Sequence, residues 1–166
     1  MASWLTAGPI ILQDNLNISP INFGWHTMIV GIAFLFGAYL NSKIVPRLGI
    51  IKMIFTGCSL ILLGGVLLLI PMLFFNVLNL TVFIIPVMVS IAGISMVIPN
   101  AYAQGVSGRA KIAGITVALL SAIQMIGGSL FSAIISSAHE NNQIPLGCIF
   151  LSIGLIILYL LIKLNK

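Results

Sequence analysis

The sequence predicts an all-α, polytopic membrane protein, a helical bundle with about six transmembrane segments. Of its 166 residues, 60% are hydrophobic and only 5% are charged, whereas an ordinary soluble domain carries about 25% charged residues. Continuous runs rich in leucine and isoleucine recur along the chain, and each approaches the roughly 20 residues that a helix needs to cross a bilayer. A transmembrane β-barrel would instead show alternating segments of about ten residues.

The apolar runs follow one another within a single transmembrane domain that covers residues 1–166. The expected spans are residues 1–13, 20–41, 50–70, 79–99, 112–137 and 145–163. At about 1.5 Å of rise per residue, the first segment is too short for a hydrocarbon core of about 30 Å. We therefore expect a truncated first span and an incomplete chain.

Local signals mark the boundaries of the spans. Ser19 is a suitable N-cap for the second span, and Pro20 is a suitable first helical residue. Gly24, Gly31 and Ala38 recur every seven residues, and we expect this seam of small side chains to pack against another helix. Pro71 is expected to end the third span, and Pro86 to kink the fourth. Pro145 begins the sixth span.

The spans differ in polarity. The third and sixth are almost uniformly aliphatic, and because lipid is as apolar as leucine, we expect them to face lipid. The second, fourth and fifth carry more small and polar residues, and we expect them to face an interior or a partner. Gln124, near the middle of the fifth span, either bonds another helix or lines a cavity. Two sets of three spans, each with a featureless third member, are typical of a 3+3 inverted repeat.

The basic residues predict the topology. They lie between spans two and three, between spans four and five, and after span six: Lys43, Arg47, Lys52, Arg109, Lys111, Lys163 and Lys166. All seven fall on one side when the crossings are counted, while Asp14, Glu140 and both histidines fall near the other. Such a bias marks the cytoplasmic side, so we expect a multi-pass protein of the bacterial inner membrane with a cytoplasmic C-terminus. The bases lack interleaved aromatic residues, which argues against a nucleic-acid partner.

No motif predicts an enzyme, a metal site or a cofactor. Gly105 to Gly108 match the GxSG of intramembrane serine proteases. The general base would be His26 or His139, which both lie near the opposite membrane face, whereas nucleophile and base must lie within about 3 Å. The histidines show no metal-ligand spacing. Cys58 and Cys148 are expected at different depths, so no disulfide is expected.

Several motifs together resemble a known family. Gly37-x-x-x-Asn41-x-x-x-Val45-x-Arg47-x-Gly49 resembles the second signature loop of the major facilitator superfamily, which joins the eighth and ninth helices. Ile18-Ser19-Pro20-x-x-Phe23-Gly24-Trp25, Pro99-Asn100-Ala101 and Ala113-Gly114-Ile115-Thr116-Val117-Ala118-Leu119 resemble drug:proton antiporters of the bicyclomycin-resistance type. Asn41 stands where this loop usually has an acidic residue.

The resemblance implies the C-terminal six-helix half of a twelve-helix multidrug efflux transporter, as a fragment or as one part of a split protein. Its ninth and twelfth helices would lie away from the substrate cavity. Gly37, Asn41, Arg47 and Gly49 would form the gating and packing loop. From polarity and approximate depth, we expect a substrate path to be lined by Trp4, Ser90, Ser95, Gln124 and Met125.

The expected partners are the lipid bilayer, a small hydrophobic drug-like substrate, and either the missing N-terminal six-helix half or a second copy. The chain has no acid at the middle of a span, so we do not expect it to pump by itself. The alternatives are a self-standing small membrane scaffold or assembly protein, active as a homodimer, and a non-functional gene remnant.

Overall fold

The computed structural model describes residues 2–75, 78–108, 110–137 and 143–164, and the described residues form helices and short connections. The elements are α1 (Ala2–Pro9), the π-helix η1 (Ile10–Asn15), α2 (Pro20–Leu48), α3 (Ile50–Phe75), α4 (Leu80–Val106), the 3₁₀ turn η2 (Ala110–Ile112), α5 (Ala113–Ser137) and α6 (Ile144–Leu164). The predicted all-α class is confirmed.

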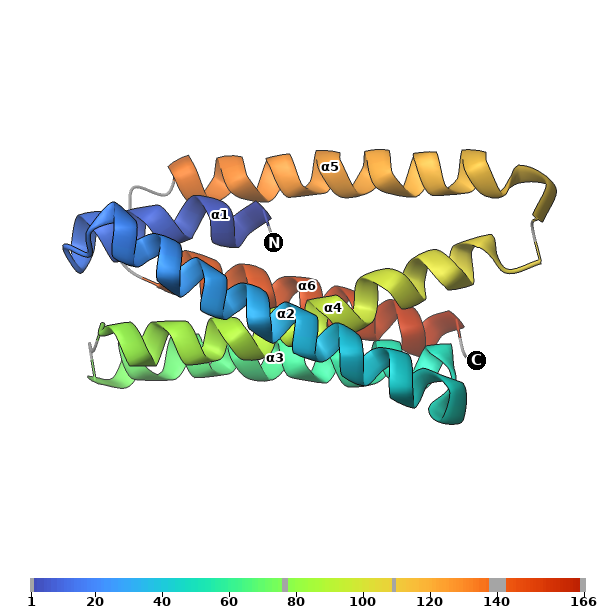
Figure 1. The fold of residues 1–166 in the computed structure, drawn as a ribbon, viewed down its shortest axis with the longest axis horizontal. Coiled ribbons are helices and arrows are strands. Elements are labelled where there is room, and N and C mark those ends of the chain that lie inside the picture. Colours follow the sequence, from blue (N-terminus) through green and yellow to red (C-terminus); the bar gives the residue numbers. More distant parts are fainter. Residues whose placement is uncertain (1, 76–77, 109, 138–142, 165–166) are drawn as a thin grey trace.

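Five of these helices, α2 to α6, are long and apolar enough to cross a membrane. They alternate in direction, so the α2–α3 junction, η2 and the C-terminal end of α6 lie at one end of the bundle (Figure 1). Lys43, Arg47, Lys52, Lys111 and Lys163 belong to these elements, whereas Arg109, His139, Glu140 and Lys166 lie outside the described residues. The described basic residues therefore share one end, as a single membrane side requires.

Three helices continue past prolines at which we expected a loop or the end of a span. Pro46, Pro71 and Pro99 lie inside α2, α3 and α4, so the prediction that Pro71 ends a helix was wrong. A proline removes one N–H, but in lipid the other backbone groups still need internal partners, which favours continuing the helix. The expected loop between the second and third spans shrinks to Gly49, whose φ of 84° suits glycine and whose N–H bonds Val45 O.

The central helix is α4. It packs against α2 and α3, and α3 packs in turn against α6. Helix α5 runs along the opposite side and touches mainly α1 (Figure 1). In the most apolar stretch of each helix, 56% of the residues are buried for α4 but only 6% for α5.

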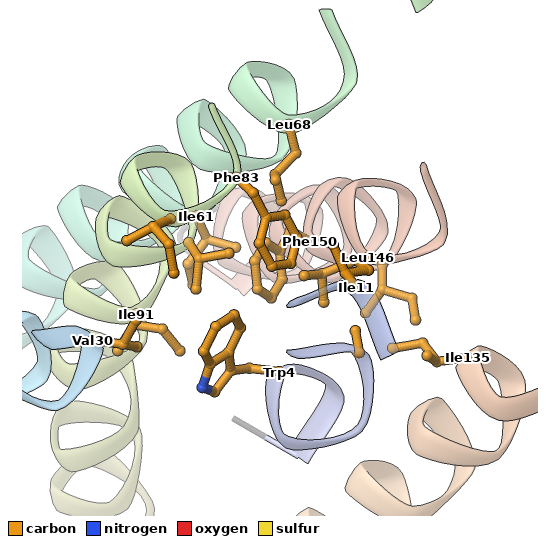
Figure 2. Close-up of a cluster of buried hydrophobic side chains, with 14 of the residues drawn as sticks. Trp4, Ile11, Val30, Ile61, Leu68, Phe83, Ile91, Ile135, Leu146 and Phe150 are labelled. Carbon is orange, nitrogen blue, oxygen red and sulfur yellow. The ribbon is translucent and has the colours of Figure 1, made fainter. Parts of the chain in front are cut away.

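A buried apolar cluster packs α1 against the other helices of the bundle. Trp4 lies beside Phe83 of α4, and both are fully buried together with Leu68 and Phe150 (Figure 2). The ring centroids of Trp4 and Phe83 are 5.8 Å apart. This cluster joins α1 to α3, α4 and α6, so the short first helix is a structural part of the bundle.

Glycines bring α3 and α4 together. A Cβ atom at Gly57 would lie 2.7 Å from the carbonyl oxygen of Gly93, and one at Gly64 would lie 2.6 Å from that of Pro86. Only glycine permits so close a backbone approach. The expectation that α3 simply faces lipid was therefore incomplete: its glycine face is buried against α4, while Leu63, on its outer face, is exposed.

The predicted seam on α2 meets no other helix of the described chain, so its packing against another helix stays a prediction. No described atom lies within 4 Å of a Cβ position at Gly24 or Gly31. The side that packs instead carries Val30, Ala33, Gly37 and Asn41. A seven-residue repeat defines a helix face but not the neighbour that the face meets, so the small-residue pattern alone could not choose between the two sides.

Candidate functional site

The crossing of α2 and α4 is held by a buried pair of amides. Asn100 Nδ2 donates to Asn41 Oδ1 over 2.6 Å and to the carbonyl oxygen of Met96 over 2.7 Å. Both asparagines are buried. An amide inside a membrane bundle needs such partners, and each interhelical bond contributes on the order of 1 kcal/mol. Asn41 therefore acts as a neutral interhelical link, without the charge that an acidic residue would bring.

One turn before Asn41, Gly37 allows the same two helices to touch. A Cβ atom at Gly37 would overlap Ser95 Oγ and would lie 2.7 Å from the carbonyl oxygen of Ala92. Ser95 is buried there and donates to Ala92 O over 2.7 Å. The structure thus brings two signature-loop residues, Gly37 and Asn41, together with Ser95, which we had assigned to the substrate path.

The other two signature-loop residues lie at the end of α2. Arg47 is exposed in the last turn of the helix, and Gly49 forms the connection to α3. Nearby, Lys43 Nζ lies 5.7 Å from the centre of the Tyr39 ring, within range of a cation–π contact. The predicted loop therefore separates into a buried packing part and an exposed basic end.

Two residues predicted to line a substrate path pack between helices in the described chain. Trp4 is 1% exposed, and no described group accepts a hydrogen bond from its Nε1. Figure 2 shows this nitrogen pointing away from Phe83 and Phe150. Ser90 is fully buried against Gly64 of α3, where a Cβ atom would overlap its Oγ. Their assignment to a substrate path stays a prediction.

Gln124 lies in a second polar cluster, which joins α4 to α5. Tyr102 OH donates to Gln124 Oε1 over 2.9 Å, and the same phenolic oxygen lies 3.0 Å from Ser121 Oγ. Because the phenolic hydrogen is used for Gln124, the Ser121 hydroxyl is the donor in the second bond. Both alternatives stated for Gln124 are met, since it bonds another helix and also lines a cavity.

That cavity lies between α5 and the α3, α4 and α6 helices. Its volume is about 300 Å³, and its wall combines isoleucines of those three helices with Gln124, Gly127, Gly128 and Phe131 of α5. Gln124 also borders a shallower hollow of about 520 Å³ together with Met125, whose side chain is 76% exposed. Gln124 and Met125 therefore share one side of α5.

Tyr102 was missed because the fourth span was expected to end at Pro99. Since α4 continues to Val106, Tyr102 is a helical residue that faces α5. One signal was present in the sequence: Ile98, Tyr102 and Gly105 are spaced four and three residues apart across Pro99, so one helix face continues past the proline.

The protease reading finds no support in the arrangement of the helices. Ser107 is the C-cap of α4, and His26 lies in the second turn of α2, at the opposite end of the bundle (Figure 1). Among the described residues, no three His, Cys, Asp or Glu side chains gather as metal ligands. Both cysteines are free thiols.

The helices and their glycine contacts define a multi-pass helical membrane protein with a cavity beside α5. Comparison of the chain with protein-family models, with curated proteins and with solved structures gives no match.

Proposed function

We propose that this protein is the C-terminal six-helix half of a major facilitator-type efflux transporter, a drug:proton antiporter of the bicyclomycin-resistance type. In this proposal it acts with an N-terminal six-helix half on a small hydrophobic drug-like substrate. The main support is the uneven burial of the helices. The two helices with small and polar residues on their outer sides, α2 and α5, are the least covered by the rest of the chain.

Helix α2 offers a surface suited to another helix layer. Gly24 and Gly31 face space that no described residue fills, and Trp25, Ile32 and Tyr39 are exposed close by. In lipid, helices associate chiefly where small residues let their backbones approach closely. A second six-helix half packed on this side would use the glycines that the chain itself leaves open.

Helix α5 supports the proposal through its polarity. Gln124, Ser129 and Ser136 are exposed along it, whereas lipid-facing helices carry few polar groups. Ser129 satisfies its own hydroxyl by donating to Met125 O over 2.9 Å. A large amide such as Gln124 fits better beside a water-filled path or a partner than in contact with acyl chains.

The α2–α4 crossing has a defined role in this proposal. Alternating access is largely a rocking of one helix bundle against another around a fixed site. The contacts of Gly37 with Ser95 and of Asn41 with Asn100 would keep α2 and α4 moving as one body. Asp14, the one acidic residue that the structure describes, lies at the end of η1, so we place the proton-binding acid in the partner half.

The described basic residues lie at one end of the bundle, and this supports an orientation of the protein in the membrane. Lysine and arginine are enriched on the cytoplasmic side of membrane proteins. We therefore propose the bacterial inner membrane, with the C-terminus and the α2–α3 connection in the cytoplasm.

The test is reconstitution from two chains in bacteria. The protein, carrying Gly31→Cys and Cys148→Ser, is co-expressed with an N-terminal six-helix half of a bicyclomycin-type antiporter that has single cysteines along its facing helices. We expect bicyclomycin resistance only when both chains are present, together with a disulfide between them from position 31.

The matched control is Leu155→Cys on α6, whose side chain is 57% exposed and which we expect to face lipid. It should give no disulfide with the partner half. A disulfide from position 31 to a second copy, without resistance under any pairing, would overturn the transport proposal and favour the homodimeric scaffold.

A further inference from the structure

The cavity beside α5 has the size and the chemistry of a small-molecule site. Its volume of about 300 Å³ is at the lower end of the range for ligand pockets, which runs from about 300 to 1,000 Å³. Four helices contribute to its wall, and Gln124 is the only residue of that wall with a polar side chain. An apolar chamber with a single fixed polar group favours an apolar ligand that is oriented by one hydrogen bond.

The hydrogen bonds that Gln124 already makes decide whether its amide can donate to a ligand or accept from it. Its Oε1 already accepts from Tyr102, and Ser121 in turn holds the phenolic oxygen of Tyr102. The amide is therefore fixed with its oxygen toward α4. No described residue accepts a hydrogen bond from Gln124 Nε2, so its two N–H donors remain for a ligand. A donor in an apolar chamber gains from any acceptor that reaches it.

The lack of charge on the cavity wall and the depth of Gln124 in the membrane further restrict the chemistry of the ligand. The wall of the cavity has no ionisable side chain, and an unpaired charge would be costly there, so the ligand is neutral. Gln124 lies near the middle of α5. The ester groups of lipids lie at the headgroup level, beyond the roughly 30 Å core, so a lipid's own carbonyl does not reach this depth.

We propose that the α4–α5 cavity binds a neutral, lipophilic small molecule whose carbonyl or ether oxygen accepts a hydrogen bond from Gln124 Nε2. The site lies inside one chain, among α3, α4, α5 and α6, and does not need a partner half. Because Gln124 is also one of the residues expected to line the substrate path, this inference rests on the proposed function and specifies the ligand chemistry at that residue. The site is tested in the single chain and transport is tested with two chains, so the two failures can be distinguished.

Benzophenone is a suitable probe because it is neutral and apolar and has one carbonyl acceptor. Under ultraviolet light its excited carbonyl abstracts a hydrogen atom from a nearby C–H group, and the two resulting radicals join in a C–C bond, so the adduct keeps the mass of both molecules. The full chain in lipid nanodiscs is irradiated with increasing benzophenone and mapped by peptide mass spectrometry. We expect saturable labelling confined to the four segments that line the cavity: Ile61 of α3, residues 94–98 of α4, 124–131 of α5 and 153–157 of α6.

Two substitutions test the site, each with a matched control. Gly127 lines the cavity, and its Cβ position has open space, so Gly127→Leu adds a side chain at the cavity wall. Gly114, near the start of α5, has equally open space and does not line the cavity, so Gly114→Leu is its control. Gln124→Leu removes the donor, and Gln104→Leu makes the same change outside this cavity. We expect labelling to fall by about tenfold for Gly127→Leu and, from one lost hydrogen bond, by about fivefold for Gln124→Leu. Both controls should label as the unchanged protein does.

Two results would overturn the proposal. Unsaturable labelling along all exposed helices, equal in every variant, would mean that the probe only dissolves in the bilayer. Labelling lost in Gly127→Leu but unchanged in Gln124→Leu would mean that the cavity holds acyl chains without using the amide.

Discussion

Helices α4 and α5 are nearly equal in length and both strongly apolar, with mean hydropathies of 2.4 and 1.8, yet one is the centre of the bundle and the other stands at its side. Both carry glycines. Gly93 of α4 meets Gly57 of α3, with a Cβ-to-oxygen separation of 2.5 Å, whereas Gly114 and Gly127 of α5 meet no described atom. A glycine therefore does not by itself bring helices together; a neighbouring helix must also present a surface that fits against it.

The two helices are also held by different forces. The α3–α4 contact is steric, and any added side chain must separate the backbones. The α4–α5 contact depends on the hydroxyls of Tyr102 and Ser121 and on the amide of Gln124, and Leu120 of α5 packs beside Gly105 of α4. Dispersion along a fitted surface accumulates over many atoms, whereas a few hydrogen bonds contribute only a few kcal/mol. Helix α5 should accordingly open at lower free energy than α4.

The largest effect is expected from Gly57→Leu. The new side chain would meet Gly93 O, which the backbone of α4 fixes, so we expect a loss of about 3 kcal/mol or more in the free energy of unfolding. Unfolding in mixed detergent–SDS micelles measures it. Gly114→Leu on α5 is the matched control and should change stability by less than about 0.5 kcal/mol. Equal losses for the two variants would remove the contrast between the helices.

The second effect concerns the α2–α4 amides. Asn41→Leu leaves Asn100 without one acceptor in a buried site, and we expect it to cost about 1–2 kcal/mol, as should Asn100→Leu. A double-mutant cycle should give a coupling of about 1 kcal/mol, because the double variant leaves no unpaired amide. Additive losses, with no coupling, would show that the two asparagines act independently.

Tyr102→Phe tests the weaker attachment of α5. It removes the donor to Gln124 and the acceptor for Ser121 while keeping the ring, and we expect α5 to open more easily by about 1 kcal/mol. Hydrogen exchange of the α5 amides should therefore quicken by about fivefold, with α3 unchanged. Tyr159→Phe, on the exposed side of α6, is the control. Faster exchange in α3 as well would mean that α5 opens only with the whole bundle.

The smallest effect distinguishes two faces of α2. Gly31→Ala adds a methyl group in open space and removes backbone freedom from the unfolded state, so we expect stability to rise by up to about 1 kcal/mol. Gly37→Ala on the same helix should lower it, because its methyl group meets Ser95 and Ala92 O. A loss at position 31 equal to that at position 37 would show that both faces are packed.

Much of the fold was predictable from the sequence. The capping role of Ser19 is confirmed, because its hydroxyl accepts from Asn22 N over 3.3 Å, and Pro20 begins α2 as expected. The ends of α2, α3 and α4 were less predictable, since a proline costs one hydrogen bond while ending a helix in lipid exposes several. That error hid Tyr102, the member that α4 contributes to the α4–α5 polar cluster.

The sequence by itself determined the class of protein. Long apolar runs can satisfy their backbone groups in lipid only as helices, and the clustered bases require one common end. Tertiary structure alone decided which small residues meet: Gly57 with Gly93, Gly37 with Ser95, and nothing described with Gly31. It also decided that Gln124 accepts a hydrogen bond from Tyr102 of α4 and lines a cavity beside α5. The physical reason is that periodicity fixes the faces of a helix, whereas the rotation and the neighbour of each face depend on complementary shapes far apart in the chain.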